Sequence, residues 1–407
     1  MTSILFTLRL IKNALKYTIH TRYKWLLLFF LIWLYRVDFV PDSGGGMGKL
    51  IQIASLGGMW CLVAKYSNGL LPMMQRKANQ AVKSCVIFYI YAAFSLIWSI
   101  MPFFSAYMAF QNILFIFCFL WFFSKFQTFE SLEKAFLLLA VGINLYEFVG
   151  ARIVMGGARL FYHHLSSGSV AAIVVVYCIS ELVATKVMSS ERRLLLRGSF
   201  FISMVMLIFS TSSGANAGAL FGIAIGLLFS GRVVWSFLLF GGVFFLYVNQ
   251  DMIEQIILFL NPGKSMAMIE TGTGRRFIWD AIWDAFYQRP TLGYGFACVE
   301  RHVGPIINIE LVDAHNSYMG IIGSLGIVGG LLFGVHILFL FKSLFPYRKR
   351  IGFLGLFSSL SCVLLNGYSY GYLSGKTCSI TLMYFILIIL SFFYNKRRVS
   401  KNECVNE

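Results

Sequence analysis

The chain has 407 residues, of which 58% are hydrophobic and 13% charged, and its mean hydropathy is +0.75. These values exclude an ordinary soluble globular protein, and repeated apolar runs bounded by charges are typical of transmembrane helices. The net charge of +17 does not indicate a nucleic-acid binder, because Lys and Arg cluster in short loops at the ends of apolar runs, where they set membrane orientation. We therefore expect an all-α polytopic membrane protein that binds no nucleic acid.

The apolar runs predict about twelve transmembrane helices, and the alternation of basic loops places both termini in the cytoplasm. A basic stretch before Trp25–Leu34 looks like a signal sequence without a small-residue cleavage site, so we expect an uncleaved first helix. The expected spans are 24–40, 50–64, 84–101, 103–123, 135–150, 168–185, 198–212, 215–230, 233–248, 316–341, 352–372 and 377–394.

One segment, 249–315, differs in composition from the apolar remainder of the chain. It holds eight of the 17 acidic residues and five Lys or Arg residues. With both termini in the cytoplasm, an even number of spans puts it on the outer side of the membrane. We therefore divide the chain into helices one to nine (1–248), a large loop on the outer side (249–315), and helices ten to twelve with a basic cytoplasmic tail (316–407).

Within this loop, Arg275–Gln288 has the periodicity of an amphipathic helix. A helix with two tryptophans on its apolar face suits the membrane–water boundary. Pro290 ends the helix, and 291–296 reads as a glycine-assisted turn. The expected apolar face comprises Ile278, Trp279, Ile282, Trp283 and Phe286.

His315 and Asn316 stand at the start of the tenth predicted span. The positive end of a helix dipole disfavours imidazolium, so a histidine there stays neutral and suits a general base. The alternative is that both residues form a polar cap at the membrane boundary.

Arg275 and Arg276 begin the amphipathic helix, where guanidinium groups and backbone N–H groups together bind phosphate or diphosphate. The alternative is that an arginine extends its charge to lipid headgroups. Arg289, Arg301 and His302 are further candidates for substrate binding, against the alternative of a solvated loop. Arg159 and Asn316 are also candidates for substrate binding.

Metal-ligand spacing, Asp-x-Asp pairs and phosphate-binding glycine loops are missing from the sequence. The sequence therefore predicts neither a metal nor a cofactor. Any chemistry should act on a lipid-borne substrate at the outer face.

Four motifs follow one another over roughly 60 residues: Gly274-Arg275 with Trp279, PTLGYGF at 290–296, HNSY at 315–318 and LGIVG at 325–329. Their order and spacing resemble the bacterial O-antigen ligases and Wzy-type polysaccharide polymerases. The resemblance implies metal-independent transfer of a glycan from undecaprenyl diphosphate to an acceptor hydroxyl. It also implies that the protein lies in a bacterial inner membrane and that the loop 249–315 is periplasmic. It also implies that His315 helps to activate the acceptor and that Arg275 contacts the donor diphosphate.

The chain departs from this resemblance at one place. Many relatives carry an arginine in a Ser-x-Ser-Arg motif between two middle helices, taken as a second phosphate contact, but here 210–213 is followed by Gly214. Arg276, Arg159 or Arg301 are candidates to replace that arginine.

The resemblance leaves three functions to compare. A polymerase of lipid-linked repeat units for O-antigen or capsule is favoured, because the arginine typical of ligases is missing. The alternatives are an O-antigen ligase that transfers glycan to lipid A-core, and a transporter of the lipid-linked oligosaccharide. A transporter should place charge near the bilayer midplane, whereas the polar residues here gather outside. The expected partners are the lipid-linked oligosaccharide, a chain-length regulator and a flippase.

Overall fold

The computed structural model describes residues 26, 28–33, 46–66, 80–154, 165–185, 188–210, 212–248, 275–309, 313–348, 350–375 and 377–394. In these ranges the regular structure is helical, without β-strands. The helices are α3 (Gly46–Tyr66), α5 (Gln80–Phe94), η2 (Ser95–Ile97), α6 (Pro102–Phe123), α7 (Phe129–Val154), α8 (Leu165–Ala184), α9 (Ser190–Ser210), α10 (Ser213–Phe229), α11 (Val233–Val248), α14 (Arg275–Gln288), α15 (Val299–Ile306), α16 (Ser317–Leu344), η4 (Phe345–Tyr347), α17 (Phe353–Asn366) and α18 (Ser379–Tyr394).

The expectation of a polytopic membrane protein is confirmed. Five helical segments in the described ranges are long and apolar enough to cross a membrane: Gln80–Ile97, Pro102–Phe123, Leu165–Ala184, Ser190–Ser210 and Ser317–Tyr347. Four further apolar helices of 10–17 residues lie at predicted spans, in α3, α10, α17 and α18. The total of about twelve spans and the periplasmic position of the loop stay predictions.

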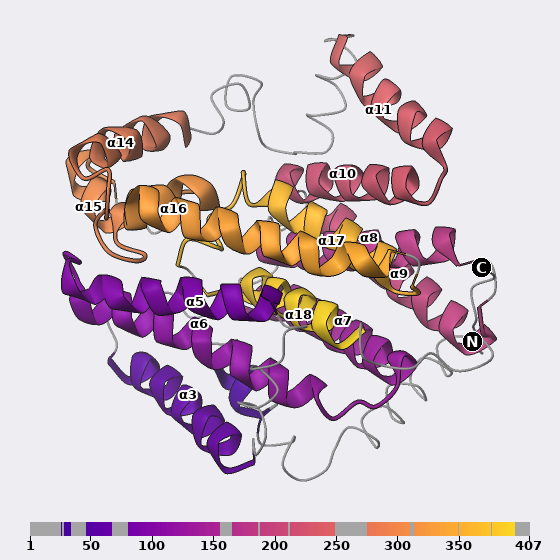
Figure 1. Cartoon of the computed structure of the whole chain (residues 1–407), viewed down its shortest axis with the longest axis horizontal. Helices are drawn as coiled ribbons and strands as arrows, with labels where there is room; N and C mark the ends of the chain where they lie inside the picture. The colour runs from indigo at the N-terminus through magenta and orange to yellow at the C-terminus, as the bar shows by residue number, and fades with distance from the viewer. Residues whose placement is uncertain are drawn as a thin grey trace.

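The helix α18 forms the centre of the molecule. All of its residues, from Ser379 to Tyr394, are buried, and it packs against α5, α6, α7, α8, α16 and α17. A helix that is apolar on every side belongs in such an enclosed position. Figure 1 shows this helix in yellow among the others, with most helices running side by side.

Large apolar side chains cover the outer sides of the bundle. Phe201 on α9 and Leu338 on α16 are 69% and 71% exposed, and Trp235 and Phe237 on α11 are similarly exposed. In water such a surface would drive aggregation, whereas lipid tails solvate it at no cost. The exposed apolar sides therefore agree with a protein embedded in a bilayer.

Two predicted helix boundaries were wrong. The expected span 352–372 ends as a helix at Asn366, and the described residues that follow, 367–375 and 377–378, are not helical. The expected span 84–101 leaves the α-helical conformation after Phe94. Periodicity could not reveal either end, because Tyr, Leu and Ile in these loops are as apolar as the helices. Only part of the expected first span, 24–40, lies in the described residues.

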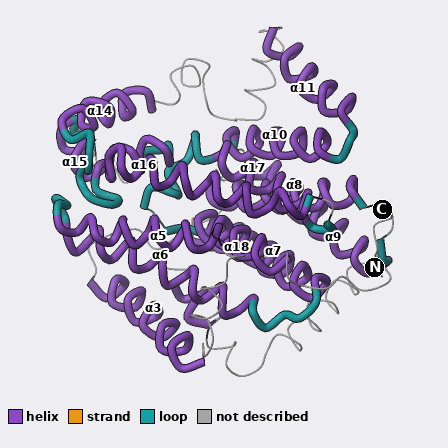
Figure 2. The backbone as a smooth tube through the Cα atoms, in the orientation of Figure 1, coloured by secondary structure: helices purple, strands orange, loops and turns teal. Residues whose placement is uncertain are grey.

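Several connections meet at one end of the bundle, which we call the loop end. They are the α5–α6, α9–α10 and α17–α18 connections, together with α14 and α15 (Figures 1 and 2). The backbone N–H of Ile100, between α5 and α6, donates to the carbonyl of Tyr294 at 3.1 Å. A Cβ on Gly214, at the start of α10, would lie against Ser369 between α17 and α18. All of these connections are ones that the predicted topology puts on the periplasmic side.

The helix α16 is broken where the glycine-assisted turn packs against it. Gly326 has φ 65° and ψ −166°, and a Cβ there would lie 2.2 Å from the carbonyl oxygen of Thr291. The N–H of Ile327 donates to the carbonyl of Pro290 at 2.8 Å, and the N–H of Gly295 donates to that of Ser324 at 2.8 Å. The turn therefore supplies the backbone partners that the broken helix lacks.

The predicted amphipathic helix Arg275–Gln288 is confirmed as α14, but its apolar face packs differently from the expectation. Ile278 and Ile282 are buried in a cluster with Val299 and Val303 of α15, and α14 also contacts α16. Of the two tryptophans, Trp283 is 38% exposed, whereas the indole Nε1 of Trp279 donates to the carbonyl of Ala314 at 3.0 Å. Much of the face thus packs on the protein, which fixes the position of Arg275.

Candidate active site

Arg275 lies at the first position of α14 and reaches the α17–α18 loop. Its Nη1 donates to the backbone carbonyl of Ser369 at 3.0 Å. Partial burial lowers the pKa of Arg275 below its usual value, and the negative charge of Asp313 opposes this effect. A guanidinium stays protonated despite such a shift. Arg275 is therefore a half-buried cation, and one of its guanidinium nitrogens, Nη1, is bound by the Ser369 carbonyl.

His315 lies directly before α16 in a left-handed backbone conformation, with φ 52°. This conformation is uncommon for a residue with a Cβ and costs about 1 kcal/mol. The backbone N–H of His315 donates to Oδ1 of Asp313 at 2.8 Å. Asn316 is the N-cap of α16, and its Oδ1 accepts from the N–H groups of Tyr318 and Met319 at 3.0 and 3.1 Å.

The α17–α18 loop wraps around the start of α16. The N–H of Ser317 donates to the carbonyl of Gly367, and its hydroxyl donates to the carbonyl of Tyr370, both at 2.7 Å. The hydroxyl of Tyr318 donates to the carbonyl of Leu364 at 2.5 Å. The HNSY motif therefore places His315 against the same loop that Arg275 contacts.

Two acidic side chains are buried beside His315 and Arg275. Asp313 and Glu300 are 8% and 5% exposed. Burial raises the pKa of Glu300 to about 8, the charge of Asp313 adds to the shift, and hydrogen bonds from the backbone, including one from Ala314, oppose it. At neutral pH a protonated Glu300 spares the site a second negative charge, which leaves the positive charge of Arg275 available to an anion.

The other predicted site residues do not all converge on this place. Arg276 is exposed on α14, and Arg289 lies at the far end of that helix, about 20 Å away along its axis. The guanidinium of Arg289 stands 4.9 Å from the ring of Tyr294, which stacks on His302 at 4.0 Å. Burial and the charge of Arg289 lower the pKa of His302. These residues form a second polar group at the loop end.

Of the candidates to replace the missing arginine, Arg301 is likewise not placed beside Arg275. Arg301 lies on α15 with its guanidinium 3.9 Å from the ring of Phe104 on α6, an arrangement that occupies its cationic face. Arg159 lies outside the described residues.

The turn that lacks the arginine nevertheless lies next to the site, through Gly214, the residue that follows the motif. A Cβ on Gly214 would lie 2.1 Å from the hydroxyl of Ser369 and 3.3 Å from Oδ1 of Asn366. Ser369 is the residue whose carbonyl binds Arg275. The polar turn between α9 and α10 therefore approaches Arg275, but this loop conformation leaves no room for a side chain at 214.

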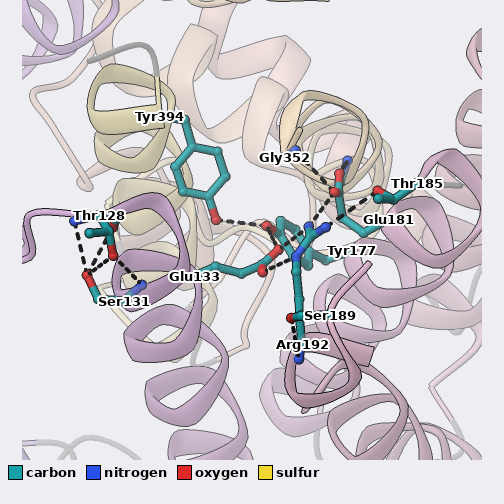
Figure 3. A network of polar contacts seen from close by, with 11 residues as sticks. Thr128, Ser131, Glu133, Tyr177, Glu181, Thr185, Ser189, Arg192, Gly352 and Tyr394 are labelled. Carbon is teal, nitrogen blue, oxygen red and sulfur yellow. Dashed lines mark hydrogen bonds and ion pairs between the residues drawn. The ribbon is translucent and has the colours of Figure 1, made fainter. Parts of the chain in front are cut away.

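A second group of buried ionisable residues lies near the start of α7, the end of α8 and the start of α9. Figure 3 shows this group from close by. Arg192 forms ion pairs with Glu133 and Glu181 at 2.6 and 2.8 Å. Glu181 also accepts from the N–H groups of Gly352 and Gly355 at the start of α17, and Tyr177 donates to Glu133. The group is closed by its own contacts and is only a few per cent exposed, so it joins α7, α8, α9 and α17 rather than serving a substrate.

Among the described residues, no group of three or more His, Cys, Asp or Glu side chains is arranged to hold a metal ion. The described part of the loop end instead offers a half-buried cation, a histidine before a helix, and carboxylates around them. Such an arrangement can receive a diphosphate and accept a proton from a hydroxyl.

Residues 198–334 match the family model described as O-antigen ligase. The matched segment covers α10, α11, α14, α15 and much of α9 and α16, and it contains Arg275 and His315. The resemblance to that family and its Wzy relatives is thus confirmed over about a third of the chain. The match supports a membrane glycosyltransferase related to lipopolysaccharide synthesis, and it does not separate polymerase from ligase. A comparison with curated proteins found no match.

Sequence reasoning missed three contributors to the site. Asp313 and Glu300 counted only as acids of a polar loop, and the α17–α18 loop was expected to be helix as far as 372. The sequence signal for that loop is its composition, because NGYSYGYLSG at 366–375 combines three glycines with three tyrosines. Such a stretch is a poor helix interior and a good turn.

Proposed function

We propose that this protein polymerises undecaprenyl-diphosphate-linked oligosaccharide repeat units at the periplasmic face of the inner membrane. The observation that carries the proposal is that Arg275 and the backbone of His315 both lie against one loop, 367–375, within a fold whose segment 198–334 matches the O-antigen ligase family. Lipid-linked glycans present their diphosphate at the membrane surface, which is where a half-buried arginine at the end of a helical bundle can bind it.

In the proposed reaction His315 takes the proton of an acceptor hydroxyl, and the resulting oxygen attacks the anomeric carbon of the donor glycan. The bond between that carbon and the diphosphate oxygen breaks, and lipid diphosphate leaves with the bonding electrons. Arg275 stabilises the charge that develops on the diphosphate. Preorganised positive charge is the main demand of such a step, because the leaving group is good once its charge is held.

The polymerase is preferred over the ligase because the arginine of the Ser-x-Ser-Arg motif is missing. Relatives that resemble ligases carry this second phosphate-binding arginine, whereas here Ser213, followed by Gly214, stands after Ser210-Thr-Ser212. A transporter is less well supported. Arg192 is closed in a buried network with its two glutamates. The other buried ionisable groups described within the bundle, Glu147 and His336, bond to hydroxyl groups of neighbouring helices.

The test is a surface-polysaccharide gel of a strain that lacks this protein and is complemented with variants. For a polymerase, deletion collapses the long-chain ladder to core plus one repeat unit, and His315→Ala fails to restore it. Loss of all glycan from lipid A-core would instead show a ligase, and an unchanged ladder would favour a transporter or another polysaccharide.

Arginine replacement tests the diphosphate contact in the same strain. Arg275→Lys should lose most of the long chains. The planar guanidinium of arginine can bind the Ser369 carbonyl and a phosphate at the same time, whereas the compact ammonium of lysine cannot. Arg193→Lys is the matched control, since Arg193 is exposed near the start of α9, at the other end of that helix from the loop end. Equal ladders from both variants would contradict the role of Arg275.

A further inference from the structure

The short turn before α16, residues 313–315, is bound through its backbone by other parts of the chain. The N–H of Ala314 bonds to the Glu300 carboxylate on α15, and its carbonyl accepts from Trp279 on α14. The N–H of His315 bonds to Oδ1 of Asp313 at 2.8 Å. The turn that presents the histidine is thus fixed from two helices and from its own aspartate.

The Asp313 carboxylate packs directly against the backbone of Gly371 on the α17–α18 loop. A Cβ on Gly371 would lie 1.9 Å from Oδ1 of Asp313 and 3.4 Å from the backbone nitrogen of His315. Only a residue without a side chain allows the loop to approach the carboxylate this closely. Asp313 is 8% exposed, so water competes little with its carboxylate for the His315 N–H.

The contact from Asp313 matters because of the conformation that it stabilises. His315 has φ 52°, whereas Asn316 has φ −156° and starts a helix. An aspartate that accepts from the N–H two residues later forms an Asx turn, which competes with regular helix at this point. Without that acceptor, the chain before Asn316 would relax to a negative φ at His315 and move the imidazole.

We propose that Asp313 is the positioning residue of this site. Its carboxylate, seated on Gly371, holds His315 in the left-handed conformation from which the imidazole meets the acceptor hydroxyl. The inference rests on the proposed function, since it assigns the geometry of the base that the function requires. Asp313 touches neither donor nor acceptor, and it acts through the His315 backbone.

The test uses full-length protein in lipid nanodiscs and, as substrate, lipid-linked repeat units extracted from the deletion strain. Asp313→Ala should lower kcat by about 100-fold, the loss expected for a reacting group misplaced by about 1 Å, with the KM for the extracted lipid changed about twofold or less. Asp313→Asn keeps an Oδ1 acceptor and should recover kcat to within about threefold of the unmodified protein. An Asn variant as slow as the Ala variant would overturn the proposal.

Gly371→Ala tests the contact between Gly371 and the Asp313 carboxylate. The added methyl group must displace the carboxylate, so kcat should fall as in Asp313→Ala, and the double variant should be no slower than Asp313→Ala alone. Gly334→Ala on α16 is the control, because a Cβ there meets nothing within 4 Å. Additive losses in the double variant would show that Gly371 and Asp313 act separately, which contradicts the inference.

A His315→Ala background separates this inference from the proposed function. If His315→Ala is fully active, the proposed function loses its base whatever Asp313 does. If His315→Ala is inactive while Asp313→Ala is fully active, the function stands and the positioning role fails. Size-exclusion profiles and melting of every variant, with Asp313→Asn as the near-isosteric reference, separate misfolding from misplacement.

Discussion

The break in α16 at Gly326 gives a prediction whose magnitude follows from the structure. Its φ and ψ of 65° and −166° lie in a region that is essentially confined to glycine, and a side chain there costs about 1–3 kcal/mol in backbone strain. A Cβ would also lie 2.2–2.6 Å from backbone atoms of Thr291 and Leu292, which adds about 1–3 kcal/mol of overpacking. Gly326→Ala should therefore lower stability by about 2–6 kcal/mol.

The substitution should also affect function, because the turn 290–296 that packs on Gly326 is connected to α14. Residues 290–296 connect α14 with α15 and pack on the α16 break, so displacing them disturbs the helix that begins with Arg275. The assay is thermal unfolding of the detergent-purified chain, followed by near-ultraviolet circular dichroism, together with the polysaccharide ladder of the complemented strain. Gly326→Ala should melt well below the unmodified protein and restore few long chains.

The control substitution lies on the same helix. Gly334 is exposed in ordinary helix, and an alanine there meets nothing within 4 Å, so Gly334→Ala should be neutral or stabilising by up to about 1 kcal/mol. If the two variants melt together and restore equal ladders, the turn does not require the break, and the reasoning is refuted.

Two further predictions concern buried ionisable groups. The pKa of Glu300 in the folded protein, about 8, exceeds that of an unfolded glutamate, so the folded state binds the extra proton and stability should fall as pH rises from about 5 to 8. Glu300→Gln should flatten this fall in melting temperature. An unchanged slope would contradict the assignment. Arg192→Ala leaves Glu133 and Glu181 buried without their cation and should destabilise the protein by about 3–5 kcal/mol. Arg193→Ala is its exposed control, and equal melting of the two would contradict the network's role.

The site shows how far sequence reasoning reaches. Arg275 and His315 were recognisable from motifs, and α14 begins and ends where its periodicity predicted, because the apolar spacing and Pro290 mark both limits. The contribution of 367–375 was hidden, since its tyrosines and leucine continue the apolar character of α17. The expected membrane contact of α14 was also incomplete, because Ile278 and Ile282 bury the same apolar face against α15 that lipid could have covered.

By itself, the sequence determined that the membrane-embedded part is helical and which segments are apolar. A chain in lipid must satisfy its backbone within each segment, so long apolar runs leave little choice but helix. Periodicity says nothing, however, about which polar residues meet after folding. Arg275 reaches Ser369 over 94 positions, and Asp313 finds its seat on Gly371, only because α14, α16 and α17 pack together at the loop end. Tertiary structure alone decided that these side chains share one site.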